Sequence, residues 1–137
     1  MTENPNVTRL RQCYADWDTS HGANPEVWSA ILAEDCTLSS PGAGRTGPEL
    51  PVIGRCRADA ISYLSDFTKD WEMEYYRIDE YICDGDRVVA IGSTAWKNKA
   101  TGKRCESPKV DIWSFRDGKA VSISEYYDTA SLLEAAA

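Results

Sequence analysis

The segment 107–128, SPKVDIWSFRDGKAVSISEYYD, constrains the fold more than any other part of the chain. Apolar and polar residues alternate on both sides of Asp117-Gly118. An Asp-Gly pair between two alternating runs is a strong signal for a β-hairpin. The segment therefore predicts two long antiparallel strands joined by a tight turn, which we expect to be a three-residue loop over 116–118.

The register of this hairpin decides which side chains share a face. A three-residue loop pairs Phe115 with Lys119, and it follows that Lys109 lies opposite Glu125 and Asp111 opposite Ile123. One face then combines ionisable and aromatic groups, namely Lys109, Asp111, Trp113, Phe115, Val121, Ile123, Glu125 and Tyr127. The other face is small and uncharged, with Pro108, Val110, Ile112, Ser114, Ala120, Ser122, Ser124 and Tyr126. The first face is a candidate site and the second a candidate packing surface.

The size of the chain predicts one domain over residues 1–137 with a real core. Its hydrophobic and charged fractions are ordinary for a globular protein, and no apolar run approaches the roughly 20 residues of a membrane span. The start of the chain lacks a basic region followed by an apolar one. We therefore expect a cytoplasmic protein that does not enter a membrane.

The charge and the histidine count exclude several function classes. A net charge of −7 argues against a nucleic-acid partner, so a small neutral or apolar ligand fits better. His21 is the only histidine, which disfavours an imidazole-based zinc site and a histidine-dependent triad. The five scattered cysteines form no CxxC pair and are expected to be reduced packing residues. No metal and no cofactor are expected.

A helical first half is followed by a strand-rich second half. The expected elements are helices over 5–18 and from 25, a strand over 36–40, a Pro/Gly loop over 41–51, a helix over 57–69, strands over 72–83 and 87–97, the hairpin, and a helix over 129–137. This order predicts an α+β, cone-shaped fold. In it, N-terminal helices cover a strongly curved, mixed but mostly antiparallel sheet and enclose a hydrophobic pocket.

This order of elements, with Gly54 after the Pro/Gly loop and the ending FRDGKAVSISEYYDT, resembles the SnoaL-like polyketide cyclases. They belong to the superfamily of ketosteroid isomerase, limonene epoxide hydrolase and the nuclear transport factor proteins. The resemblance covers nearly the whole chain. It implies the fold but no single activity, because the superfamily holds isomerases, cyclases, hydrolases, dehydratases and non-catalytic modules.

The resemblance also implies site residues. Glu125 falls where the cyclases and limonene epoxide hydrolase each place a catalytic aspartate. Lys109 and Asp111 fall where the cyclase pocket has glutamine and histidine. Asp111 also matches the ketosteroid isomerase aspartate that stays protonated and donates to the substrate oxyanion.

Other positions depart from these relatives. Gly92 and Thr94 stand where limonene epoxide hydrolase needs arginine and aspartate, and Ser40 stands near the general base of ketosteroid isomerase. The isomerase tyrosine aligns near Cys13 or Tyr14. These differences argue against epoxide hydrolysis and against steroid isomerisation by those mechanisms.

Together these patterns predict a pocket walled by Trp96, Trp113 and Phe115. Burial raises the pKa of a carboxyl group and a lysine lowers that of its partner, so Glu125 is expected to be the ionised base and Asp111 the neutral donor. The three expected catalytic residues are thus Glu125, Asp111 and Lys109. Expected substrate contacts are Tyr14, Trp17, Thr94, Trp96, Trp113 and Ile123.

The leading hypothesis is a cofactor-independent acid/base enzyme acting next to a carbonyl group. It would perform an aldol-type cyclisation or an isomerisation on a small hydrophobic, polyketide-like or terpenoid substrate. The alternatives are a non-catalytic ligand-binding or dimerisation module, in which a Lys109–Glu125 pair is structural, and a hydrolase or dehydratase of the superfamily. The uncharged face of the hairpin further predicts a homodimer packed through the sheet.

Overall fold

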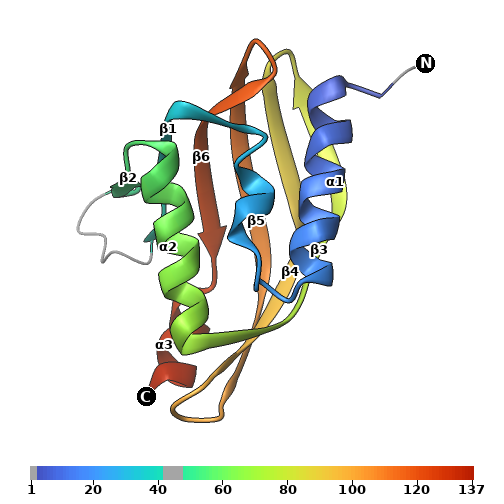
Figure 1. Cartoon of the computed structure of the whole chain (residues 1–137). Helices are drawn as coiled ribbons and strands as arrows, with labels where there is room; N and C mark the ends of the chain where they lie inside the picture. The colour runs from blue at the N-terminus through green and yellow to red at the C-terminus, as the bar shows by residue number, and fades with distance from the viewer. Residues whose placement is uncertain (1–2, 42–47) are drawn as a thin grey trace.

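The computed structural model describes residues 3–41 and 48–137. The elements are α1 (Pro5–Thr19), the 3-10 turn η1 (Pro25–Trp28), β1 (Leu32–Ser39), β2 (Val52–Gly54), α2 (Arg57–Asp70), β3 (Trp71–Asp84), β4 (Arg87–Asn98), β5 (Arg104–Arg116), β6 (Lys119–Tyr127) and α3 (Thr129–Ala136). The strands form one mixed sheet, and α1 and α2 lie over one of its faces (Figure 1). The predicted α+β fold is confirmed.

The helix ends follow from local sequence. The side chain of Asn4 accepts a hydrogen bond from the backbone of Asn6, and Pro5 occupies the first helical position of α1. At the other end of the chain, Asp128 accepts a hydrogen bond from the backbone of Ser131 and caps α3, as expected. The apolar stripe of α1 is buried against the sheet and includes Val7, Leu10, Tyr14 and Trp17.

The second predicted helix is wrong. The Asn24-Pro25 signal produces only the single turn η1, and the chain then enters β1 at Leu32, four residues before the predicted strand. The backbone amide of Ala120 donates to the carbonyl of Ile31, and Leu32 pairs with Ala120 of β6. Pairing with a distant strand has therefore outweighed the local helix signal. Most of the predicted Pro/Gly loop, residues 42–47, lies outside the described residues.

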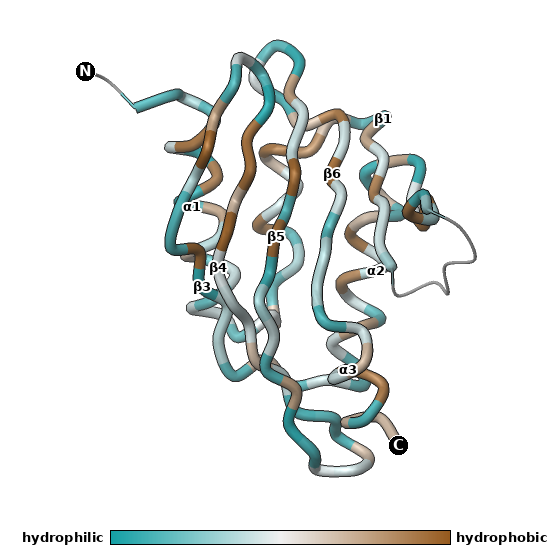
Figure 2. Tube along the Cα trace, turned by 180° about the vertical axis from the view of Figure 1, so that it is seen from behind, coloured by the Kyte–Doolittle hydropathy of each residue, from teal (hydrophilic) through white to brown (hydrophobic). Residues whose placement is uncertain are grey.

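The strands follow the order β2-β1-β6-β5-β4-β3, in which β1 and β6 are parallel and the other pairs antiparallel. Bulges interrupt β3 between Met73 and Tyr75 and between Ile78 and Glu80, and such bulges bend a strand. One face of the sheet meets the helices, while the other is turned outward (Figure 2). None of the helices in the described residues is long and apolar enough to span a membrane.

The hairpin between β5 and β6 differs from its predicted register. Asp117 and Gly118 both have positive φ angles, 51° and 78°, as a two-residue type I′ turn requires. The predicted three-residue loop is therefore wrong, and so are the predicted pairs. The observed pairs are Arg116 with Lys119, Phe115 with Ala120, Trp113 with Ile123, Asp111 with Glu125, and Lys109 with Tyr127.

A bulge at Val121 follows the turn, because Phe115 pairs with Ala120 but Ser114 pairs with Ser122. Because of this extra residue, Ile123, Glu125 and Tyr127 of β6 point to the same face as their partners on β5. The inner face consequently keeps every predicted member except Val121, whose place is taken by the fully buried Ala120. The charged and aromatic groups therefore share one face, as expected.

All five cysteines are free. Cys13, Cys36 and Cys105 are buried packing residues, as expected, whereas Cys56 is half-buried and Cys83 is exposed.

Candidate active site

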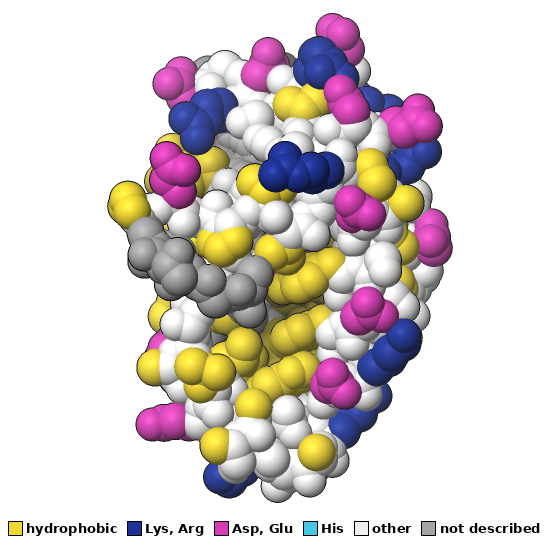
Figure 3. Space-filling view, turned by 90° about the vertical axis from the view of Figure 1, so that its left-hand side faces the viewer, with side chains coloured by type: hydrophobic (Ala, Val, Ile, Leu, Met, Phe, Trp, Pro, Cys, Tyr) yellow, Lys and Arg dark blue, Asp and Glu magenta, His cyan; other side chains and the backbone are white. Residues whose placement is uncertain are grey.

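A cavity lies between the helices and the inner face of the sheet. The volume of this cavity is about 100 Å³. Its wall is largely aromatic and includes Tyr14, Trp17, Phe67, Tyr76, Trp96 and Trp113. Figure 3 shows a hollow on the α2 side of the molecule, where hydrophobic side chains gather and charged side chains lie around the rim.

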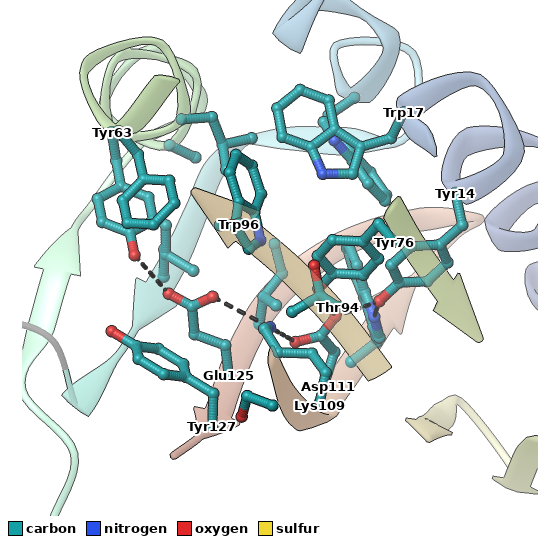
Figure 4. Close-up of a pocket in the computed structure, with 18 of the residues that line it drawn as sticks. Tyr14, Trp17, Tyr63, Tyr76, Thr94, Trp96, Lys109, Asp111, Glu125 and Tyr127 are labelled. Atoms are coloured by element: carbon teal, nitrogen blue, oxygen red, sulfur yellow. Dashed lines mark hydrogen bonds and ion pairs between the residues drawn. The ribbon is translucent and has the colours of Figure 1, made fainter. Parts of the chain in front are cut away.

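Lys109 lies between two carboxylates in this wall. Its ammonium group donates to Asp111, two residues away on β5, and lies 3.1 Å from Oε1 of Glu125 on β6 (Figure 4). The side chains of Lys109, Asp111 and Glu125 are only 6%, 5% and 13% exposed. The register that places Asp111 opposite Glu125 thus brings all three predicted catalytic residues together.

Two tyrosines hold Asp111 from other elements. The hydroxyl groups of Tyr14 on α1 and Tyr76 on β3 both donate to Oδ2 of Asp111, the second at 2.9 Å. Nε1 of Trp113 in turn donates to the Tyr14 hydroxyl at 2.9 Å. Burial, and then the charge of Asp111, raise the pKa of both tyrosines well above the ordinary value. Both hydroxyls therefore stay protonated donors at neutral pH.

A second group of hydroxyls surrounds Glu125. Tyr63 on α2 donates to Oε2 of Glu125 at 2.7 Å. Burial, and then the charge of Glu125, raise the pKa of Tyr63. The fully buried Ser40 forms hydrogen bonds that lower the pKa values of Tyr63 and Tyr127, although burial keeps both raised overall. A connected set of hydroxyls thus links Glu125 to the end of β1.

Opposing effects act on Lys109. Burial alone would lower its pKa, but the charges of Asp111 and Glu125 and their hydrogen bonds outweigh burial and raise the pKa above the ordinary lysine value. Lys109 is therefore an ammonium group at neutral pH. It can supply a positive charge and hydrogen bonds, and it is unsuited to act as a neutral base or nucleophile.

All six residues expected to contact the substrate line the cavity: Tyr14, Trp17, Thr94, Trp96, Trp113 and Ile123. Phe115 is not among the described residues that line the cavity, so the prediction that it forms part of the wall is wrong. Its ring stacks on Trp113, with centroids 6.2 Å apart, and is buried in the core.

The sequence pattern placed Tyr127 on the candidate face without giving it a role, and it did not indicate Tyr63 or Tyr76. Tyr63 could have been found, because Ala60, Tyr63 and Phe67 follow helical spacing and share the inner face of α2. Tyr127 alternates with Glu125 on β6 and shares its face. Tyr76 had no such signal, since the bulge after Met73 breaks the alternation of β3.

Potential metal ligands do not gather in the described part of the chain. It contains no group of three or more His, Cys, Asp or Glu side chains that could hold a metal ion. His21, in the loop after α1, lies with Nδ1 3.0 Å from the carbonyl oxygen of Met73.

Comparison with known proteins places this geometry among related folds. Residues 10–123 match the family model of the SnoaL-like domain. An NTF2-like protein from Burkholderia xenovorans is 26% identical, with a TM-score of 0.76 and 98% of each chain covered. A protein with a ketosteroid isomerase-like fold from Catenulispora acidiphila, solved with trimethylamine, is 18% identical, with a TM-score of 0.74 and 98% and 93% covered.

A third similar structure is IdmH from Streptomyces antibioticus, provisionally a polyketide cyclase. It is 15% identical, with a TM-score of 0.73, and the alignment covers 97% of this chain and 99% of IdmH. No curated protein matches the chain.

Proposed function

The chain belongs to the SnoaL-like domain family, and we propose that it is a cofactor-independent acid/base enzyme acting at a carbon next to a carbonyl group. The reaction would be an aldol-type cyclisation or an isomerisation of a small hydrophobic, polyketide-like or terpenoid substrate. The observation that carries the proposal is the buried Lys109 between Asp111 and Glu125 in the wall of an aromatic cavity. Buried groups of this kind are what proton transfer near neutral pH requires.

Glu125 is the proposed base. A carboxylate offers about four acceptor positions, and Glu125 receives donors from Lys109 and Tyr63, whereas Asp111 receives three. Glu125 therefore keeps more capacity to accept a proton from the substrate. In the proposed step, it removes a proton from the carbon next to the carbonyl, becomes a carboxylic acid and leaves an enolate.

Lys109 and Asp111 have supporting roles. The ammonium group of Lys109 stabilises the negative charge that develops on the enolate. Asp111 accepts three hydrogen bonds, so its place in the site is that of an acceptor and not of the neutral donor expected from the sequence. Asp111 then fixes Lys109 and Tyr14 in place rather than donating to the substrate.

The test is a screen of small carbonyl compounds for deuterium exchange at the adjacent carbon, followed by substitution of the base. Glu125→Gln keeps the shape and removes the proton acceptor, so it should lower the rate by roughly two to four orders of magnitude while the fold survives. Asp111→Asn should cost less, because its amide still contacts the tyrosines. If Asp111→Asn costs as much or more, the base has been assigned to the wrong carboxylate.

The second candidate is a ligand-binding module without catalysis. It is favoured by the observation that Lys109, Asp111 and Glu125 satisfy one another and three tyrosines without any ligand. In that case no compound of the screen would exchange faster with the protein than without it. Both variants would then melt lower, and neither would change a rate of exchange per folded molecule.

A further inference from the structure

We infer that the cavity selects a small organic cation, with an alkylated ammonium group as the recognised feature. Among the described residues that line it, Asp111 and Glu125 are acidic and Lys109 is the only basic one. The formal charge of the wall is thus −1, and all three groups are almost completely buried. This inference names the charge of the substrate for the proposed site, but the binding preference would hold without catalysis.

An unbalanced buried charge is costly, because little water is present to solvate it. Hydroxyl dipoles of Tyr14, Tyr76 and Tyr63 offset part of this cost, but they bring no net charge. A cation in the cavity would balance the wall, whereas an anion would double the imbalance. The chain as a whole carries −7, which also attracts cations towards the mouth.

The aromatic wall suits an alkylated cation in particular. The faces of aromatic rings carry partial negative charge and attract ammonium groups that have few hydrogen-bond donors. Phe67 and Trp96 meet edge to face with centroids 4.8 Å apart, and both line the cavity together with Trp17. The site already contains one such contact, since Nζ of Lys109 lies 5.5 Å from the ring centre of Tyr76.

The volume limits the size of the cation. A cavity of about 150 Å³ in another protein accommodates benzene, whereas the space here is about 100 Å³. A space of this size limits the recognised group to a small head such as trimethylammonium. Any longer substrate must extend through the mouth seen in Figure 3. A positive nitrogen would also acidify an adjacent C–H group, which is consistent with proton removal by Glu125.

The experiment compares two probes of matched size, tetramethylammonium and the neutral tert-butanol, by calorimetric titration at constant ionic strength. We expect tetramethylammonium to bind at least tenfold more tightly. Glu125→Gln removes one negative charge and should bring the ratio of the two dissociation constants, tert-butanol to tetramethylammonium, close to one. Glu72→Gln, an exposed position on β3, is the matched control and should leave the ratio unchanged. Equal or tighter binding of tert-butanol by the unmodified protein would overturn the inference.

A second variant keeps the test independent of Glu125. Trp96→Leu should weaken tetramethylammonium several-fold more than tert-butanol, because only the cation uses the face of the ring. A ratio unchanged in both Glu125→Gln and Trp96→Leu would overturn the inference as well. If the cation preference holds but no carbonyl compound exchanges deuterium, the proposed enzyme function fails while this inference stands. Deuterium exchange without a cation preference would overturn this inference and leave the proposed function intact.

Discussion

At the scale of single residues, Lys109 is the group on which the site depends. Lys109→Met keeps most of the side-chain volume but leaves Asp111 and Glu125 buried without their cation. We expect the free energy of unfolding to fall by about 3–5 kcal/mol, as when one partner of a buried ion pair is removed. Urea unfolding measures this. Lys97→Met, at an exposed position of β4, is the control and should change stability by less than about 0.5 kcal/mol.

Gly92 gives a second prediction at this scale. A Cβ atom there would lie 1.8 Å from the carbonyl oxygen of Arg77, beside the bulge of β3. Gly92→Ala should therefore destabilise the protein by roughly 3 kcal/mol or more in thermal melts. Gly85→Ala is the matched control: its φ of 58° is strained for alanine but the space is open, so it should cost only about 1 kcal/mol. Similar losses for both variants would contradict the steric explanation.

The buried tyrosines predict how stability depends on pH. In the unfolded chain, Tyr14 and Tyr76 lose their protons near pH 10, whereas burial raises the pKa of both far above that value in the folded chain. Above pH 10 the unfolded state therefore binds fewer protons, and the free energy of unfolding falls as pH rises.

Lys109 also makes the free energy of unfolding fall as pH rises, because its pKa in the folded chain is raised as well. Its contribution is complete below the ordinary lysine pKa and is lost as pH rises through the folded value. Each such group lowers stability by about 1.4 kcal/mol per pH unit. Thermal melts should show a steep loss between pH 10 and 11.5, and the loss should be less steep in Tyr76→Phe. A melting temperature that stays constant over this range would refute the prediction.

At the scale of elements, the β5–β6 hairpin shows what sequence could and could not predict. The Asp117-Gly118 turn and the alternation of both strands were sufficient to place Lys109, Asp111 and Glu125 on one face. The sequence pair Asp-Gly itself favours the observed type I′ turn, whereas the bulge at Val121 was not predictable, since a bulge depends on how the strand packs against its neighbours. Beyond the bulge, the predicted and observed partners of Asp111 and Lys109 differ by two positions, so their face survived while the cross-strand partners changed.

Contacts between distant segments also explain why the start of β1 and the place of Tyr76 were not predicted. β1 begins at Leu32 because it pairs with β6, a contact between segments far apart in the sequence that local periodicity does not report. The bulge after Met73 hides Tyr76 from any pattern of alternation. Helices α1 and α2, by contrast, depend on a local apolar stripe and were predicted within about one residue at each end.

At the scale of the whole molecule, the outward face of the sheet predicts assembly. Val110, Ile112, Ser114, Ser122 and Ser124 are half-buried and uncharged, and Tyr126 is 41% exposed. Ala120, which was also expected here, belongs to the inner face instead. We expect a two-fold dimer through this face, with a light-scattering mass twice the 15.2 kDa of the chain. Ile112→Lys should yield monomers, whereas a monomeric unmodified protein at micromolar concentration would rule out the dimer.

The parallel pairing of β1 with β6 has a consequence for the order in which the chain folds. Strands β3 to β6 are consecutive hairpins with short turns, so they can pair as soon as they emerge. β1 is made early, but its partner β6 is the last strand of the sheet. Such long-range pairing is slow, because the intervening chain must first be ordered. The ligand cavity can therefore close only after β6 has left the ribosome, and a nascent chain that ends at Gly118 would hold neither Glu125 nor a complete wall.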